Sequence, residues 1–140
     1  MKQAYDVDLS GRMILVLEDE YIIASEFSEA LRRAGAVVIG PFPRVKEGLA
    51  AVRTGTPIDC AVLDVNLGGE RVWPLVDALP LGMPVILTTG YEAGEIPATY
   101  AHLPRMEKPV PAGDLIRAVA EQARLQRLQG EPPRSAFRGR

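Results

Sequence analysis

The chain has 140 residues, of which 47% are hydrophobic and 24% charged, and its formal net charge is −2. This composition is typical of one soluble globular domain, and the apolar runs are too short to cross a bilayer. No signal peptide is apparent, and a single cysteine, Cys60, excludes an intramolecular disulfide and a cysteine metal cluster. We therefore expect a cytoplasmic protein with no membrane partner.

Charge is distributed unevenly along the chain. Residues 121–140 carry five arginines and two glutamates, a net charge of +3, which leaves −5 on residues 1–120. An acidic body argues against nucleic acid as the main partner of the folded part. Residues 129–140 are expected to be a disordered, arginine-containing tail, and the first ten or so residues are also expected to be loose.

Apolar runs and helical repeats alternate through the first half of the chain. Residues 13–17 form a continuous apolar run, typical of a strand buried on both faces. Apolar residues then repeat at helical spacing over residues 23–34, and Gly35 stands where a helix C-terminus favours a left-handed residue. A second strand over residues 37–40 is expected to stop at the sequence PFP, and a short helix is expected over residues 45–55.

The same alternation continues beyond residue 55. The sequence IDCAVLDV, residues 58–65, predicts a third strand that ends in an acid. An apolar stripe over residues 72–79 predicts a helix, which Pro74 tolerates only in its first turn. The sequence PVILTTG, residues 84–90, predicts the fourth strand.

The pattern weakens after the fourth strand. Residues 90–104 contain two glycines and two prolines and have no convincing apolar face, so a helix there should be short or disordered. The sequence RMEKP, residues 105–109, predicts a brief fifth strand. An apolar stripe over residues 111–128 predicts the last helix.

Five strand-then-helix units with short connections predict an α/β fold with a doubly wound parallel sheet. In such sheets the functional crevice lies outside the carboxyl ends of the strands. The polar residues that end the apolar runs all fall at that edge: Glu18, Asp19 and Glu20 after the first strand, Asp64 after the third, Thr89 after the fourth and Lys108 after the fifth.

The three adjacent acids suggest a metal site. Two unit charges about 4 Å apart repel by as much as ~4 kcal/mol at a surface-like dielectric, so a bound cation would explain the cluster. Glu18 and Asp19 together with Asp64 make an oxygen-only site that suits Mg²⁺, and Mn²⁺ would also fit. Glu20 is assigned to the first turn of a helix, where acids favour the macrodipole. The alternative, purely structural explanation is that Glu18 and Asp19 are helix caps.

A metal with few protein ligands has room for phosphoryl oxygens. Lys108 would meet one such oxygen as a point charge, and Thr89 would offer a hydroxyl to another. Asp64 is then the natural nucleophile, and its attack on phosphorus would form an aspartyl phosphate. Alone, each of these residues has a structural explanation, and the hypothesis depends on their joint occurrence on successive strands.

Four motifs resemble those of one known family. The sequences ILVLEDE, DCAVLDVNLGG, PVILTTGY and MEKPV resemble the receiver domains of two-component response regulators, in order and approximate spacing. The resemblance covers residues 12–128 and leaves residues 1–11 as an N-terminal extension. It implies a stand-alone receiver with a flavodoxin-like, five-stranded parallel sheet of order 2-1-3-4-5 and a short or disordered fourth helix.

The resemblance also implies roles for the residues at the sheet edge. By position, Asp64 corresponds to the phosphoacceptor, and Glu18, Asp19, Asp64 and the backbone carbonyl of Asn66 correspond to the Mg²⁺ ligands. Thr89 corresponds to the switch hydroxyl and Lys108 to the phosphate-binding lysine. The peptide bond between this lysine and the following proline, here Pro109, is commonly cis in the family.

Some positions depart from the family pattern. Glu18 replaces the more frequent Asp, and Arg105 stands where a Tyr or Phe usually completes the switch. The sequence TTGY resembles in part the FATGUY subgroup, whose fourth helix is poorly formed. We therefore expect ordering of residues 90–104 to be the output, with Tyr91 as the reporting side chain, and expect Asn66 and Tyr91 to tune the lifetime of the phosphoryl group.

The implied function is that of a single-domain response regulator, not an enzyme beyond its own phosphorylation and dephosphorylation. A sensor histidine kinase or a histidine phosphotransfer protein would donate the phosphoryl group, and a downstream protein would read it. One alternative is a degenerate receiver that binds partners without phosphorylation. A remote alternative is a haloacid-dehalogenase-type phosphatase, whose nucleophile would lie on the first strand and not, like Asp64, on the third.

Overall fold

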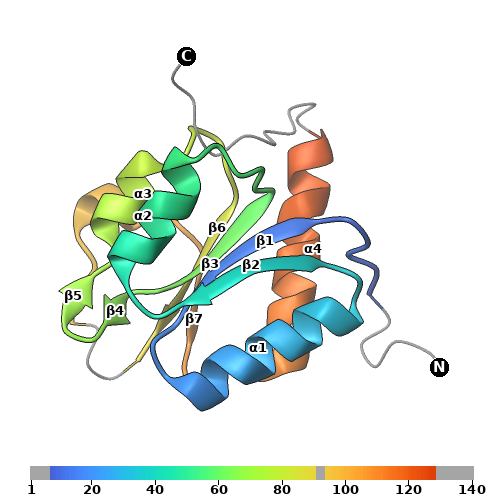
Figure 1. Ribbon diagram of the computed structural model, residues 1–140, viewed down its shortest axis with the longest axis horizontal. Helices are drawn as coiled ribbons and strands as arrows, with labels where there is room; N and C mark the ends of the chain where they lie inside the picture. Colours follow the sequence, from blue (N-terminus) through green and yellow to red (C-terminus); the bar gives the residue numbers. More distant parts are fainter. Residues whose placement is uncertain (1–6, 91–93, 129–140) are drawn as a thin grey trace.

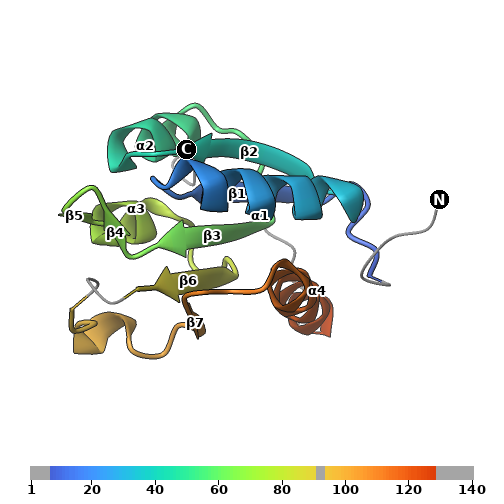
Figure 2. The same ribbon diagram turned by 90° about the horizontal axis from the view of Figure 1, so that it is seen from below.

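A sheet of five parallel strands forms the centre of the computed structural model, which describes residues 7–90 and 94–128. Side by side, the strands run in the order β2 (Val37–Phe42), β1 (Met13–Leu17), β3 (Cys60–Asp64), β6 (Val85–Thr89) and β7 (Arg105–Glu107), as Figure 2 shows from β2 to β7. This order, and the alternation of strands and helices along the chain, confirm the predicted flavodoxin-like α/β fold.

Helices cover both faces of the sheet (Figure 1). Helices α1 (Tyr21–Arg33) and α4 (Ala112–Leu128) pack on one face, and α2 (Val45–Arg53) and α3 (Trp73–Ala78) pack on the other. Pro74 lies in the first turn of α3, as the sequence requires. Within the described residues, no helix has the length and apolar character needed to span a membrane.

Two hydrophobic clusters are separated by the sheet. Leu17, Leu63 and Leu87 point into the cluster under α2 and α3, whereas residues one position away along the same strands, such as Val62 and Ile86, point into the cluster under α1 and α4. Side chains of a strand alternate between its faces, so each strand contributes to both clusters. The same alternation determines on which face of the sheet each polar side chain at a strand end lies.

Strand β2 is longer than predicted. It continues through the cis bond between Gly40 and Pro41 to Phe42, so the sequence PFP does not stop it. Strand β2 is an edge strand, where a proline without an N–H is tolerated. Gly40 has a φ of 105°, and a Cβ there would lie 2.8 Å from the carbonyl oxygen of Val16, so the passage requires glycine.

A small hairpin follows β3 and was not predicted. Strands β4 (Asn66–Leu67) and β5 (Glu70–Arg71) are antiparallel and are joined by Gly68 and Gly69, both with positive φ. The Gly-Gly pair was a sequence signal for a two-residue turn. The hairpin lies at the carboxyl edge of the parallel strands (Figure 2).

The N-terminal prediction is wrong for the described part of the extension. Leu9 is only 1% exposed, and its N–H donates a hydrogen bond to the carbonyl of Ala34 over 2.7 Å. Residues near position 9 therefore pack on the domain and are not loose. The rest of the predicted extension, residues 1–6, and the predicted tail, residues 129–140, lie outside the described residues.

The region of the predicted fourth helix contains a single turn of 3-10 helix. This turn, η2 (Ala98–Tyr100), lies within described residues 94–104, so a short fourth helix was the correct expectation. Two glycines and two prolines between residues 90 and 104 explain why the described residues 94–104 form no helix longer than this turn.

Candidate functional site

Three carboxylates from two strand ends gather at the carboxyl edge of the sheet. Glu18 and Asp64 are buried, with 2% and 3% of their surface exposed, whereas Asp19 is exposed. One carboxylate oxygen of each lies within 4.8 Å of the others. The structure therefore brings together the three acids that the sequence indicated as a metal site.

Lys108 reaches into this cluster from the end of β7. Its Nζ lies 2.9 Å from Asp64 Oδ2 and 3.0 Å from Glu18 Oε1. Burial lowers the pKa of Lys108, but the hydrogen bonds and charges of Asp64 and Glu18 outweigh burial, so its pKa lies above the ordinary value. The lysine is thus a fixed positive charge beside Asp64. The bond to Pro109, which follows it, is cis.

Backbone donors of the hairpin hold two of the acids. The N–H of Gly68 donates to Asp19 Oδ2 over 2.9 Å, and the N–H of Asn66 donates to Asp64 Oδ1 over 3.1 Å. The Asn66 side chain accepts from the N–H of Gly69 over 3.1 Å, so it is used within the turn. The unpredicted hairpin is therefore part of the site, because it orients the carboxylates.

The burial and the hydrogen bonding of Glu18 are those expected of a cation ligand. Burial raises its pKa to about 7, and the charge of Asp64 adds to this effect, against the opposing hydrogen bonds from the Glu20 N–H and Lys108. Its buried Oε1 has no hydrogen-bond partner among the described residues, although it lies in ion-pair range of Lys108. An oxygen-only set with a spare buried carboxylate oxygen fits Mg²⁺.

Thr89 is the last residue of β6, the strand next to β3. Along β6 its side chain alternates with that of Thr88, and it lines a cavity with Gly90, Arg105 and Glu107. The Thr89 carbonyl accepts a hydrogen bond from the N–H of Lys108 over 2.8 Å. Thr89 is therefore next to the site, and it is joined to Lys108 through the backbone.

Two of the residues predicted to modulate the switch are Arg105 and Tyr91. Arg105, which replaces the usual aromatic residue, is exposed and donates to the carbonyl of Ala101 over 3.0 Å. It thereby fixes the end of η2. Tyr91, predicted to report the switch, lies outside the described residues.

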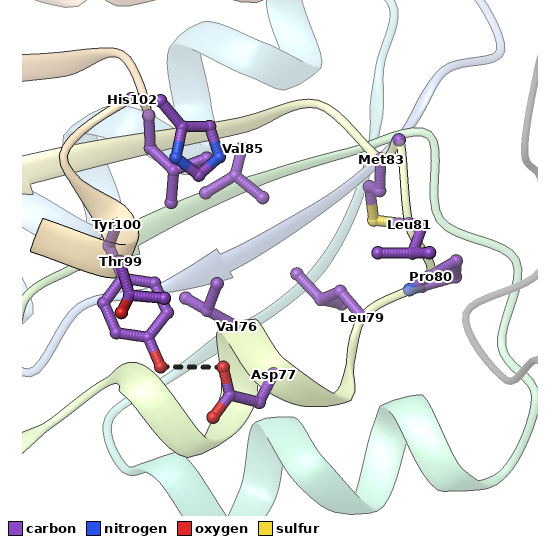
Figure 3. A pocket seen from close by; sticks show the side chains of 12 residues that line it. Val76, Asp77, Leu79, Pro80, Leu81, Met83, Val85, Thr99, Tyr100 and His102 are labelled. Atoms are coloured by element: carbon purple, nitrogen blue, oxygen red, sulfur yellow. Dashed lines mark hydrogen bonds between the residues drawn. The ribbon is translucent and has the colours of Figure 1, made fainter.

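An aromatic pair that the sequence analysis missed joins η2 to α3. The rings of Trp73 and Tyr100 stack with centroids 4.4 Å apart and planes at 6°. The Tyr100 hydroxyl donates to Asp77 Oδ1 over 2.7 Å, as Figure 3 shows, and this bond raises the pKa of Tyr100. Tyr100 lines a pocket together with Val76 and Met83. The segment after β6 is thus docked on α3.

Replacing Tyr100 by Leu should release this contact. We expect the emission of Trp73, the only tryptophan, to shift to longer wavelength and acrylamide quenching to increase. The free energy of unfolding should fall by about 1–2 kcal/mol, from the lost ring contact and hydrogen bond. Tyr21→Leu is the matched control, because Tyr21 is 83% exposed. Equal emission of both variants and the unmodified protein would show that the stack does not form in solution.

Two further side chains lie apart from the acid cluster. His102, the only histidine of the sequence, is exposed and lines the pocket beside Tyr100. Cys60 is buried, and burial raises the pKa of its thiol to about 12, which makes the thiolate rare.

Comparison with known proteins supports one family. No family model matches the sequence, and no curated protein matches it. Among solved structures, the chain resembles a response regulator receiver domain protein (CheY-like) from Methanospirillum hungatei JF-1, with 26% identity and a TM-score of 0.74 over 86% of this chain and 100% of that one. It also resembles SdrG from Sphingomonas melonis Fr1, with 32% identity and a TM-score of 0.62 over 80% of this chain and 96% of that one.

A third neighbour, a response regulator receiver protein from Sinorhizobium medicae WSM419, shares the fold at 22% identity and a TM-score of 0.68, over 84% of this chain and 98% of that one. Fold and site together define a flavodoxin-like α/β protein with an acidic cluster and a lysine at the carboxyl edge of its sheet. The chain belongs to the response regulator receiver domains.

Proposed function

We propose that this receiver acts as a response regulator that accepts a phosphoryl group on Asp64. The observation that carries the proposal is the placement of Asp64, a buried carboxylate 2.9 Å from Lys108 and within 4.8 Å of the acids Glu18 and Asp19. A nucleophilic carboxylate beside a fixed cation and a metal-ready acid pair suits transfer of a phosphoryl anion.

The transfer is an in-line displacement. A lone pair of the Asp64 carboxylate forms the new O–P bond, while the P–N bond of the donor breaks and its electron pair stays on nitrogen, which takes a proton. Lys108 balances charge on the equatorial phosphoryl oxygens. Mg²⁺, held by Glu18, Asp19, Asp64 and the Asn66 carbonyl, would supply further positive charge to the same oxygens.

The donor and the reader of the signal follow from this chemistry. A phosphohistidine on a sensor kinase or a phosphotransfer protein, or a small phosphoramidate, supplies the phosphoryl group in the cytoplasm. The Thr89 hydroxyl then binds the new phosphoryl oxygens. This contact shifts residues 90–104 toward a state that a downstream protein binds, and Tyr91 and the neighbouring Arg105 take part in the change. The protein catalyses only its own phosphorylation and dephosphorylation.

The experiment that tests this function is intact-mass analysis after incubation with phosphoramidate. We expect one phosphoryl adduct with Mg²⁺ or Mn²⁺ and none with EDTA, because an uncompensated acid cluster repels the anionic donor. Peptide mapping should place the adduct on residues that include Asp64. No adduct despite measured Mg²⁺ binding would favour the degenerate receiver, and continuous release of phosphate from simple monoesters would favour the phosphatase.

A further inference from the structure

A second threonine at the end of β6 has an unexplained hydroxyl. Thr88 is 1% exposed, and its Oγ1 has no hydrogen-bond partner among the described residues. A buried hydroxyl without a partner is unfavourable, and valine would fill the same volume without that disadvantage. A hydroxyl in this place is therefore explained best by a partner that it acquires in another state of the protein.

Strand register places Thr88 beside the acceptor. Asp64 on β3 and Met106 on β7 are its register partners, and neighbouring strands lie about 4.8 Å apart. Leu63 and Leu87, one position earlier, both face α2 and α3. Asp64 and Thr88 therefore share the opposite face of the sheet, whereas Thr89 does not.

Lys108 passes the residue that follows β6. Its Cδ lies 3.6 Å from where a Cβ on Gly90 would stand, and its Nζ ends 2.9 Å from Asp64 Oδ2. The side chain thus runs from β7 past Gly90, two residues beyond Thr88, to Asp64, the register partner of Thr88. An ammonium has three protons to donate, and among the described residues those of Lys108 go to carboxylate oxygens of Asp64 and Glu18.

We propose that Thr88 is a positioning residue for Lys108. When a cation and a phosphoryl group bind the oxygens of Glu18 and Asp64, those oxygens no longer accept hydrogen bonds from the Lys108 ammonium, which remains in a buried site. Thr88 Oγ1 is then an uncommitted acceptor that keeps Nζ at the phosphoryl oxygens. This inference rests on the proposed function, and it assigns to Thr88 a role distinct from that of Thr89.

The test compares Thr88→Val with Thr88→Ser. Without Mg²⁺, the valine variant should unfold at the same temperature as the unmodified protein or higher, because an unpaired hydroxyl is removed. With Mg²⁺ and phosphoramidate, its labelling rate should fall about tenfold, the effect of one hydrogen bond to a charged group. The serine variant should label within about twofold of the unmodified rate. Opposite effects on stability and rate would not arise from a purely structural role.

A second readout does not depend on phosphorylation. In Mg²⁺-loaded protein, ¹⁵N NMR of the lysine ammonium groups should show faster proton exchange for Lys108 in Thr88→Val than in the unmodified protein. The chain has only three lysines, so Lys46→Met helps to assign the signals.

Unchanged labelling and unchanged exchange in Thr88→Val would overturn the inference and leave the proposed function intact. If the unmodified protein takes no phosphoryl group, the proposed function fails, and the exchange rate alone still decides whether Thr88 holds Lys108. Thr88→Ala replaces Thr88→Val if the valine variant does not fold, with the same expected change in both rate and exchange.

Discussion

Asp64→Asn should abolish the phosphoryl adduct while the protein stays folded. The amide is nearly isosteric, and its oxygen can still accept the hydrogen bond from the Asn66 N–H, but it offers no carboxylate lone pair of comparable nucleophilicity. Lys108 retains Glu18 as an ion-pair partner, so the ammonium is not left alone. Intact mass and circular dichroism, measured on the same sample, separate loss of the acceptor from loss of the fold.

A matched control lies at the other end of the same strand. Asp59 immediately precedes β3, is 5% exposed, and accepts a hydrogen bond from the N–H of Met13, which an amide oxygen can also accept. Asp59→Asn should therefore keep its adduct, provided that it folds. A Mg²⁺-dependent adduct that survives in Asp64→Asn would place the nucleophile on another residue and contradict the proposed function.

Lys108→Met should destabilise the protein in the absence of divalent cations. Removing the ammonium leaves Glu18 and Asp64 buried side by side without their counter-charge, and breaking such a buried pair costs about 3–5 kcal/mol. Mg²⁺ should recover part of the loss, since a cation that binds only the folded state stabilises it by mass action. Labelling with phosphoramidate should slow by about a hundredfold or more.

Urea unfolding with EDTA and with Mg²⁺ measures this effect. Lys46→Met is the control, because Lys46 is exposed on α2, and its unfolding should be unchanged under both conditions. If Lys108→Met were as stable as the unmodified protein without Mg²⁺, the Lys108 ammonium would not be offsetting the buried charges of Glu18 and Asp64.

The fold class and the set of acids at the sheet edge could be predicted from the amino-acid pattern alone. Central strands of a parallel sheet are buried on both faces, so residues 13–17 and 85–87 are continuous apolar runs that stand out without any structure. A polar residue that ends such a run, as Asp64 does, lies at the carboxyl edge of the sheet. The order of the elements along the chain was therefore enough to predict the fold class and the acid cluster, whereas the order of the strands in the sheet was implied by the family resemblance.

Short or edge elements could not be predicted in the same way. Each strand of the β4–β5 hairpin has only two residues, too few for any periodicity, although Gly68 and Gly69 indicated the turn. The continuation of β2 beyond Gly40 depends on its position at the edge of the sheet. Burial of Leu9 depends on a contact with the far end of α1, which no local pattern contains.

Which side chains contact one another depends on the three-dimensional packing of the elements. Trp73 and Tyr100 are stacked although they are far apart in the chain, because η2 folds back onto α3. Thr88 and Thr89 are adjacent in sequence and chemically identical, yet strand register places Thr88 on the face of Asp64 and Thr89 in the cavity with Arg105. Composition and spacing specify which elements form, whereas register and packing determine the partners of each side chain.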